Sequence, residues 1–348
     1  MKIRGRDIGK DHPPYVIAEA GVHAGRNFDI AQHYVVAAKI AGADAIKFQA
    51  YTAAELATAA APAYWQTGPL SQRDVFEGTE TDEHFVRMVT AYAHTIGIAC
   101  IWTPFDKHWL SVCLDAGMDA IKVASADITN GPLLRAIGES QRDADSPCVI
   151  MSMGASSYDD VADAYDLCFF DALLHCSLAY PTPIDNANVR RLADENFLQY
   201  GAHMGYSCHV PGEDGIDACV IAVALGATII EKHFTLNKHG SGDDHYHAVD
   251  ADGLARLVRR TRNAWAACRP REGADIEAPA RLNARRSLVF ARDLPAGHVI
   301  DCDADLAAKR PGTGISPMRW REFHGRKLVC DVKADELLDE GQSGESAA

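Results

Sequence analysis

The stretch Ala227-Thr-Ile-Ile-Glu-Lys-His-Phe-Thr235 begins as an apolar, β-branched run and ends in three charged or titratable side chains. A run of this kind is typical of a buried parallel strand. Side chains alternate along a strand, so Glu231 and His233 share one face and Lys232 takes the other. Because charges at the end of a buried strand are costly unless they are paired or used, the pattern indicates either a salt-bridged strand end or metal or acid–base chemistry.

The composition is that of an ordinary globular protein. The chain has 348 residues, of which 47% are hydrophobic and 24% charged, and this length allows one large domain plus a small one. The net charge of -14 argues against nucleic acid and anionic membranes as partners. No apolar run is long enough to span a bilayer, and no hydrophobic signal core follows the basic N-terminus. We expect a cytoplasmic protein whose ten scattered cysteines are reduced core residues.

Eight short apolar runs recur along the chain, with helical patterns between them. The runs are Val16–Gly21, Ala45–Ala50, Ala99–Phe105, Ala120–Ser125, Cys148–Met153, Leu173–Tyr180, Gly201–His209 and Thr228–Phe234. Several intervals end in a glycine just before the next run, as in Ala41-Gly-Ala-Asp-Ala45, which is typical of a helix C-cap leading into a strand. Eight such units predict a TIM (β/α)8 barrel. The alternative, a doubly wound open sheet, would favour a G-x-G-x-x-G turn after the first strand, and Gly21-Val-His-Ala-Gly25 is not one.

A barrel also predicts that reactive residues lie at the carboxyl ends of its strands. Polar side chains stand at or just after the end of all eight runs: Glu19, His23, Lys47, Gln49, Thr103, Lys122, Ser125, Ser152, Tyr180, Tyr206, Ser207, His209, Glu231 and His233. One or two polar strand ends are common in any barrel. A polar end on every strand favours a catalytic site.

Two of these residues, His209 and His233, end adjacent strands. Neutral imidazoles together with substrate oxygens suit a divalent transition ion such as manganese, and the alternative is two unrelated polar histidines. The segment Gly240-Ser-Gly-Asp-Asp-His-Tyr-His247 follows the eighth strand. It reads as a substrate lid with glycine hinges or, as a less favoured alternative, as a second metal loop.

Lys47 and Lys122 form a local anion site in an otherwise acidic chain. Hydroxyl groups of neighbouring strand ends can hold a phosphate and a carboxylate with them, namely those of Thr103, Ser125 and Ser152. The competing chemistry is a Schiff-base lysine. An imine needs one lysine only, so two lysines with several hydroxyls favour a dianionic ligand. Cys176 and Cys208 are expected to be packing neighbours and not nucleophiles.

The pattern of the sequence changes after about residue 270, where short strand patterns and turns replace the alternation of strands and helices. We expect a barrel domain over 1–270, a linker over 271–284, a small, mostly β domain over 285–340 and a disordered polar tail over 341–348.

A series of motifs, in order, covers nearly the whole chain. They are Ile17-Ala-Glu-Ala-Gly-Val22, Ala41-Gly-Ala-Asp-Ala-Ile-Lys-Phe-Gln49, Thr103-Pro-Phe-Asp106, Ile121-Lys-Val-Ala-Ser125, His175-Cys-Ser177 with Tyr180-Pro181, Gly205-Tyr-Ser207 with His209, and Ile230-Glu-Lys-His-Phe-Thr235. With them the chain resembles the sialic acid synthase family, which condenses phosphoenolpyruvate with an aldose to make 2-keto sugar acids of the nonulosonate type. Arg285-Arg-Ser-Leu-Val289 and Lys309-Arg-Pro-Gly-Thr-Gly-Ile-Ser-Pro317 resemble that family's antifreeze-like (SAF) domain.

The resemblance implies a role for each matching residue. His209 and His233 are implied to bind the metal, Mn²⁺ in the first place with Mg²⁺ or Co²⁺ as alternatives. Glu19, Glu231 and Lys122 are implied to be catalytic. Phosphoenolpyruvate is implied to contact Lys47, Gln49, Thr103, Lys122, Ser125, Ser152, Tyr180 and Ser207. The acceptor is implied to contact Glu19, His23, Tyr206, Asp244 and Arg310, the last from the partner in a domain-swapped homodimer.

Two other functions stay open at this point: a Schiff-base aldolase that uses free pyruvate, and a carbohydrate-binding protein without catalysis. The chain also departs from the family pattern near the acceptor and the metal. The usual V-N-H-N-G becomes Val22-His-Ala-Gly25, an acidic residue before Tyr180 becomes Ala179, and G-Y-S-D-H becomes Gly205-Tyr-Ser-Cys-His209. We therefore expect an acceptor other than N-acetylmannosamine.

Overall fold

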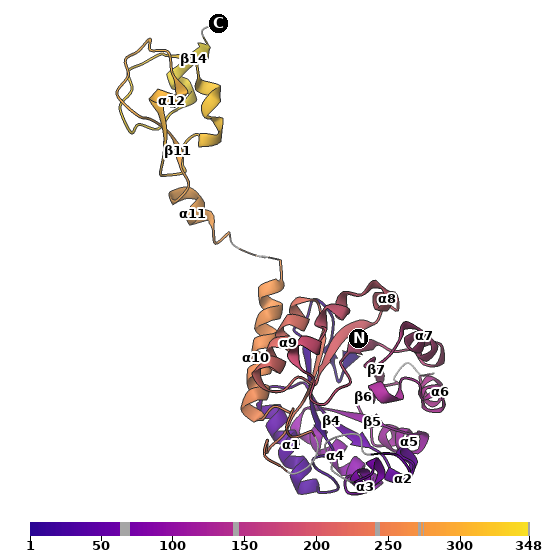
Figure 1. Ribbon diagram of the computed structural model, residues 1–348. Coiled ribbons are helices and arrows are strands. Elements are labelled where there is room, and N and C mark those ends of the chain that lie inside the picture. The colour runs from indigo at the N-terminus through magenta and orange to yellow at the C-terminus, as the bar shows by residue number, and fades with distance from the viewer. Residues whose placement is uncertain (63–69, 142–145, 241–243, 271–272, 274, 347–348) are drawn as a thin grey trace. The chain divides into compact units, whose positions relative to one another are not determined.

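The chain forms two compact units, Met1–Arg269 and Pro270–Ala348, each described here by itself (Figure 1). The computed structural model describes residues 1–62, 70–141, 146–240, 244–270, 273 and 275–346.

Eight parallel strands of the first unit close into a barrel, in the order β10-β3-β4-β5-β6-β7-β8-β9. They are β3 (Tyr15–Gly21), β4 (Ala45–Ala50), β5 (Ala99–Pro104), β6 (Ala120–Val123), β7 (Cys148–Ser152), β8 (Ala172–His175), β9 (His203–Cys208) and β10 (Ile229–His233). Each lies within one of the eight predicted runs or extends it by one residue. The predicted barrel is confirmed.

Helices surround this barrel (Figure 1). They are α1 (Phe28–Ile40), α2 (Ala53–Leu56), α3 (Gln72–Glu77), α4 (Glu83–Ile96), α5 (Lys107–Asp115), α6 (Gly131–Ser140), α7 (Tyr158–Leu167), α8 (Glu195–Leu198), α9 (Gly212–Ala224) and α10 (Ala251–Cys268). Polar N-caps begin several of them: the side chains of Asn27, Asp82 and Asp250 each accept a bond from a first-turn backbone N–H.

Side-chain alternation builds the barrel interior in layers. The layer nearest the amino ends is apolar and includes Ile17, Ile101 and Ile229. Ile3 of β1 (Lys2–Ile3) and Ile8, which follows β2 (Arg6–Asp7), pack against it. Two residues further along the strands, the same face carries polar groups: Glu19, Lys47, Thr103, Lys122, Ser152, Ser207 and Glu231. A closed apolar floor therefore supports a buried polar layer that faces the carboxyl ends.

The second unit has a core of its own, built from Leu288, Phe290, Phe323 and other apolar residues. Its elements are α11 (Ala278–Asn283), β11 (Ser287–Phe290), α12 (Cys302–Asp305), β12 (Leu306–Lys309), β13 (Arg326–Leu328) and β14 (Ser343–Ser346). Within the tail predicted to be disordered, 341–348, Ser343–Ser346 instead form β14, which pairs with β13, and 347–348 lie outside the described residues. Backbone pairing of this kind needs no apolar side chains, so a polar composition did not reveal it.

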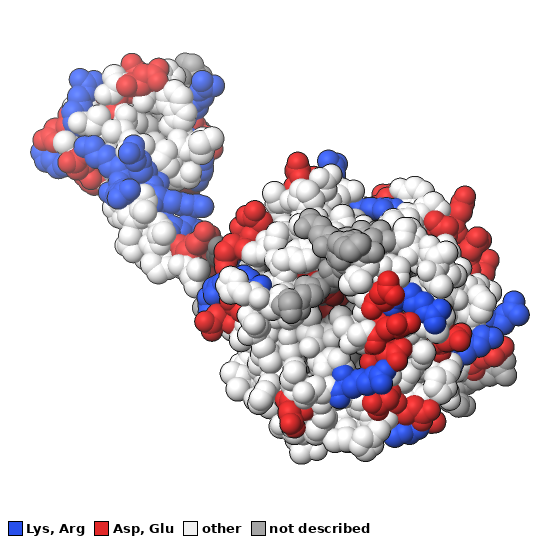
Figure 2. Space-filling model, turned by 60° about the horizontal axis from the view of Figure 1, so that its bottom comes forward, with Lys and Arg blue, Asp and Glu red and all other residues white. Residues whose placement is uncertain are grey.

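Acidic and basic side chains alternate over the barrel face in view, and Figure 2 shows no extended basic surface there. Among the described residues, no helix is long and apolar enough to cross a membrane.

Candidate active site

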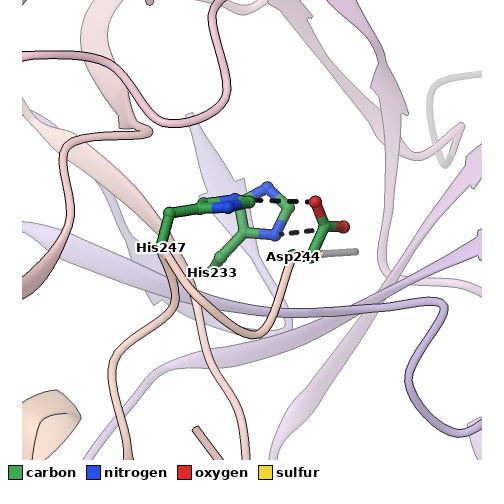
Figure 3. Close-up of side chains that lie close together, drawn as sticks. All are labelled: His233, Asp244 and His247. Atoms are coloured by element: carbon green, nitrogen blue, oxygen red, sulfur yellow. Dashed lines mark ion pairs between the residues drawn. The ribbon is translucent and has the colours of Figure 1, made fainter. Parts of the chain in front are cut away.

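Two histidines and one carboxylate meet above the end of β10. His233 ends that strand, and the loop that follows brings Asp244 and His247 back over it (Figure 3). Asp244 Oδ2 lies 3.5 Å from His233 Nδ1, and Asp244 Oδ1 lies 3.5 Å from His247 Nε2. His247 is fully buried, and neither of its ring nitrogens has a hydrogen-bond partner among the described residues. Burial lowers the pKa of both imidazoles, that of His247 to about 2, so both are neutral with lone pairs available.

His209, just after β9, faces the same group. Its ring centroid lies 5.5 Å from that of His233 and 6.1 Å from that of His247. Its Nδ1 lies 2.8 Å from the carbonyl oxygen of Ser177, which can only accept, so Nδ1 carries the proton and Nε2 keeps its lone pair. Burial lowers the pKa of His209 to about 4. The predicted approach of His209 and His233 is confirmed, and His247 is a third imidazole that the sequence analysis did not assign.

Lys232 holds the segments that carry these histidines through hydrogen bonds to their backbone carbonyls. Its side chain is fully buried on the helix-facing side of β10. The ammonium donates to the carbonyls of Cys208 (3.3 Å) and Val210 (2.6 Å), on either side of His209, and to that of His247 (3.0 Å). One cation therefore joins the segments that carry all three imidazoles, since His233 is its own neighbour in the strand. The alternation of side chains along the strand predicted that Lys232 points away from the barrel interior. Its three carbonyl partners lie in other segments and could not be predicted from the sequence.

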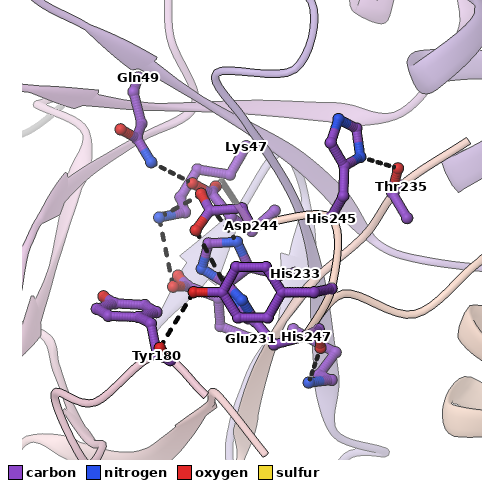
Figure 4. A network of polar contacts seen from close by, with 12 residues as sticks. Lys47, Gln49, Tyr180, Glu231, His233, Thr235, Asp244, His245 and His247 are labelled. Atoms are coloured by element: carbon purple, nitrogen blue, oxygen red, sulfur yellow. Dashed lines mark hydrogen bonds and ion pairs between the residues drawn. The ribbon is translucent and has the colours of Figure 1, made fainter. Parts of the chain in front are cut away.

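The polar layer beneath holds two carboxylates around one lysine (Figure 4). Lys47 Nζ lies 3.1 Å from Glu19 Oε2 and 3.3 Å from Glu231 Oε1. Gln49 donates to Glu19 at 2.8 Å, and Ser207 donates to Glu231 at 2.9 Å. The strand register dictates this meeting, because Glu19 pairs with Lys47 and with His233, and Glu231 pairs with Ser207.

The two carboxylates differ in their proton affinity. Burial raises the pKa of Glu19 more than Lys47 lowers it, and the charge of Glu231 adds to the increase. Burial acts in the same direction on Glu231, but the ammonium groups of Lys122 and Lys47 outweigh it and lower that pKa to about 2. A pair whose pKa values are pushed apart suits one proton carrier and one permanent anion.

Lys122 extends the layer toward a set of hydroxyls. Its Nζ donates to Ser152 Oγ at 2.6 Å and to the carbonyl of Val123 at 2.9 Å, and burial lowers its pKa to about 8. Ser125 Oγ accepts from the backbone N–H of Gly154 at 2.9 Å. Lys47 Nζ donates to Thr103 Oγ1 at 3.4 Å. The predicted anion-binding residues therefore lie in one buried layer.

Most other predicted site residues lie at the same end of the barrel. The ring of Tyr180 lies 4.3 Å from that of His209, centroid to centroid, and His23 stacks on His245 at 3.8 Å. A Cβ atom on Gly21 would stand 3.3 Å from Asp244 Oδ2, which places Asp244 over the Glu19 side of the layer. Part of the predicted lid, 241–243, lies outside the described residues.

Tyr206 does not join this group. It lies one residue before Ser207 in β9, so it points outward into the core between barrel and helices, where it is fully buried. This placement removes it from the acceptor assignment. Cys208 points the same way, with Sγ 3.5 Å from the carbonyl of Gly215 in α9, so this departure from the family pattern does not lie among the histidines. Arg310 belongs to the second unit, and its contact with an acceptor stays a prediction.

Comparison with known proteins places this arrangement in a family. Residues 34–272 match the NeuB family, and residues 285–341 match the SAF domain. N,N'-diacetyllegionaminic acid synthase of Legionella pneumophila is 32% identical over 97% of both chains. N-acetylneuraminate-9-phosphate synthase of Homo sapiens is 28% identical over 97% of this chain and 94% of its own.

Among solved structures, the N-acetylneuraminic acid synthetase of Leptospira borgpetersenii in complex with citrate superposes with a TM-score of 0.70. It is 28% identical and covers 80% of this chain and 94% of its own. The family match spans more than half of the chain, and its barrel carries the buried layer of lysines, carboxylates and histidines described above. The chain is therefore a member of the NeuB family with a C-terminal SAF domain.

Proposed function

We propose that the protein condenses phosphoenolpyruvate with an aldose or a related aldehyde, forming a nonulosonate-type 2-keto sugar acid and releasing phosphate. Membership of the NeuB family, whose relatives include legionaminic, pseudaminic and N-acetylneuraminate-9-phosphate synthases, makes it a phosphoenolpyruvate-dependent enzyme that forms carbon–carbon bonds. The observation that carries the proposal is the buried layer in which Lys47 and Lys122 stand among two carboxylates. The family supports neither a Schiff-base aldolase nor a non-catalytic binding protein.

Phosphoenolpyruvate is a compact anion with a phosphate and a carboxylate. Lys47 and Lys122 supply two ammonium groups, and Thr103, Ser125 and Ser152 supply hydroxyls around them. Buried cations surrounded by donors bind such an anion strongly because little water competes with it. Gln49, Tyr180 and Ser207 complete the set that we assign to this substrate.

The histidine group suits a divalent ion, for which the resemblance favours Mn²⁺. His233 Nδ1 and both nitrogens of His247 are buried without a hydrogen-bond partner among the described residues, and a neutral imidazole in that state is a ready ligand. The Nδ1 of His209 is engaged by the carbonyl of Ser177, which leaves its Nε2 available as a ligand. When bound, the ion would supply Lewis-acid polarisation of the acceptor's aldehyde oxygen.

The two buried carboxylates, Glu231 and Glu19, are suited to different steps of the reaction. As C3 of phosphoenolpyruvate attacks the aldehyde carbon, positive charge grows at C2, and the ionised Glu231 is suited to stabilise it. Glu19, whose pKa is raised, is suited to move a proton to or from the acceptor or the water that adds to C2. Asp244 and His23, at the rim, are assigned to the acceptor.

An isotope experiment tests this proposal. Phosphoenolpyruvate labelled with ¹⁸O in the bridging C–O–P position is incubated with the enzyme, Mn²⁺ and the acceptor that it accepts. If water adds to C2, the C–O bond breaks and the label leaves with phosphate. Label retained in the keto acid would mean that phosphorus is attacked instead and would overturn the proposal. Borohydride trapping of a pyruvate adduct on a lysine would support the Schiff-base alternative.

We also propose the oligomeric state, domain boundaries and cellular location that the sequence indicated. A domain-swapped homodimer would bring Arg310 of one SAF domain to the acceptor in the partner's barrel, with boundaries near 270 and 285. All ten cysteines are free, which supports a reducing, cytoplasmic location. Cross-linking between engineered cysteines near Arg310 and the barrel rim of a second, differently tagged copy tests the swap.

A further inference from the structure

The ring of His247 is a buried polar group without a described function. It is fully buried, and both of its ring nitrogens lack a hydrogen-bond partner among the residues that the structure describes. Leaving a buried polar group unpaired costs about 1–3 kcal/mol, so such a group calls for an explanation. Tyr180 and Tyr246 lie beside the ring, at centroid distances of 5.4 and 5.0 Å, and its Nε2 lies 3.5 Å from Asp244 Oδ1.

The spacing around His247 is that of ligands on one ion. One ligand atom each of His233, Asp244 and His247 lies within 4.8 Å of the others (Figure 3). Two metal–ligand bonds of about 2.1 Å end about 3.0 Å apart at a right angle and about 3.4 Å apart at a tetrahedral angle. Asp244 Oδ2 stands 3.5 Å from His233 Nδ1 and Asp244 Oδ1 stands 3.5 Å from His247 Nε2, so each carboxylate oxygen lies near that separation from one imidazole.

The position of His247 is fixed by the backbone. Its carbonyl accepts from Lys232 at 3.0 Å, and the same ammonium holds the carbonyls on either side of His209. Val249 N–H donates to the carbonyl of His233 at 2.9 Å, which ties the returning loop to the end of β10. The backbone that carries the His247 ring is therefore held at the end of β10 by hydrogen bonds within the protein.

We propose that His247 is a third imidazole ligand, with Asp244 as a carboxylate ligand, of the ion assigned to His209 and His233. The inference rests on the proposed function, since it concerns the same ion. Three imidazoles and one carboxylate form a nitrogen-rich set, which favours Co²⁺, Fe²⁺ and Zn²⁺ over Mg²⁺ and Mn²⁺. An ion of coordination number five or six keeps a position for the acceptor's oxygen. The site should therefore bind Co²⁺ more tightly than the Mn²⁺ that the resemblance favours.

Cobalt provides the test because its visible absorption reports ligand type and coordination number. The metal-stripped, full-length enzyme is titrated with Co²⁺, and with Mg²⁺ and Mn²⁺ in competition. The variants are His247→Ala, His247→Gln and His233→Ala. The matched control is His245→Ala, because His245 lies two residues away but its ring contacts Thr235 Oγ1 at 2.7 Å (Figure 4) and stacks on His23.

We expect the native protein to bind Co²⁺ far more tightly than Mg²⁺. Outer-shell partners typically change affinity 10–100-fold, so loss of a direct ligand should weaken Co²⁺ binding by about 100-fold or more. His247→Ala and His247→Gln should lose this affinity and shift the cobalt spectrum, while His245→Ala stays native. The melting temperature of each metal-free variant shows whether it is folded, and the glutamine variant serves if the alanine variant is not.

The outcomes separate this inference from the function on which it rests. Native Co²⁺ affinity in folded His247 variants, together with lost affinity in His233→Ala, would overturn the third ligand and leave the metal site standing. No Co²⁺ binding by the native protein would overturn the inference and the metal assignment together. Calorimetry of phosphoenolpyruvate binding to the metal-stripped protein tests the substrate assignment independently of either result.

Discussion

Replacing Lys232 by methionine should both destabilise the barrel and loosen the histidine group. The variant keeps the length and apolar stem of the side chain but removes the three hydrogen bonds, at 2.6, 3.0 and 3.3 Å, that the ammonium donates to backbone carbonyls. Hydrogen bonds to a charged group contribute about 1.5–3 kcal/mol each, so about 5–9 kcal/mol is lost. Methionine avoids the several kcal/mol that it costs to bury an ammonium group. The expected net loss is about 3 kcal/mol.

For a unit of this size, a change of about 3 kcal/mol lowers the melting temperature by about 6–12 °C. Differential scanning calorimetry of the metal-free protein measures this shift, and a Co²⁺ titration measures the effect on the histidines, which should be about 10–100-fold weaker binding. Lys238→Met is the matched control, because Lys238 is exposed on the loop after β10. A Lys232→Met protein with native melting temperature and native cobalt affinity would refute the reasoning.

Three further perturbations have defined outcomes. Burial lowers the pKa of Lys122 to about 8, so the ammonium is lost as pH rises through that value and kcat/KM for phosphoenolpyruvate should fall above about pH 8. In Lys122→Arg this fall should move to higher pH. If the fall stays at the same pH in the variant, it belongs to another group. Glu231→Gln should lower kcat about 10²–10⁴-fold with phosphoenolpyruvate binding retained by calorimetry, whereas turnover within tenfold of native would exclude Glu231 from the chemistry. Asp305 is buried and accepts hydrogen bonds from Arg292 and His298. These bonds outweigh the effect of burial and lower the pKa of Asp305. The ionised carboxylate therefore stabilises the second unit above the unfolded pKa of about 3.9, and this contribution is lost as pH falls through the folded pKa. Asp305→Asn should lower the free energy of unfolding of the second unit by about 2 kcal/mol at pH 7. In the full chain this loss appears as about 30-fold faster hydrogen exchange of β11 and β12. Exchange at the native rate would contradict the role of Asp305.

The fold followed from the sequence because its signal is local and repeated. Each barrel strand is an apolar run with a polar residue at or near its carboxyl end, and the alternation of Glu231, Lys232 and His233 fixed which of them face the barrel interior. The same rule, applied to β9, separates Tyr206 from Ser207 and excludes Tyr206 from the site, because adjacent strand residues cannot share a face.

The remaining part of the site depends on contacts that no local pattern carries. His247 lies on a loop without periodicity, and only the return of that loop over β10 brings it to His233. Lys232 is an outward residue whose partners are backbone carbonyls of two other segments, so residue types give no indication of them. The strand β14 is a further case, because backbone pairing and not composition forms it.

The central claim is the condensation itself, and one assay tests it most directly. The metal-stripped enzyme is mixed with phosphoenolpyruvate and a panel of aldoses that includes N-acetylmannosamine, with and without Mn²⁺ or Co²⁺. Phosphate release is followed, and products are identified by mass spectrometry. The account predicts metal-dependent phosphate release matched by a 2-keto acid three carbons longer than its acceptor, with an aldose other than N-acetylmannosamine preferred. A protein that neither binds phosphoenolpyruvate nor releases phosphate from it would contradict the account.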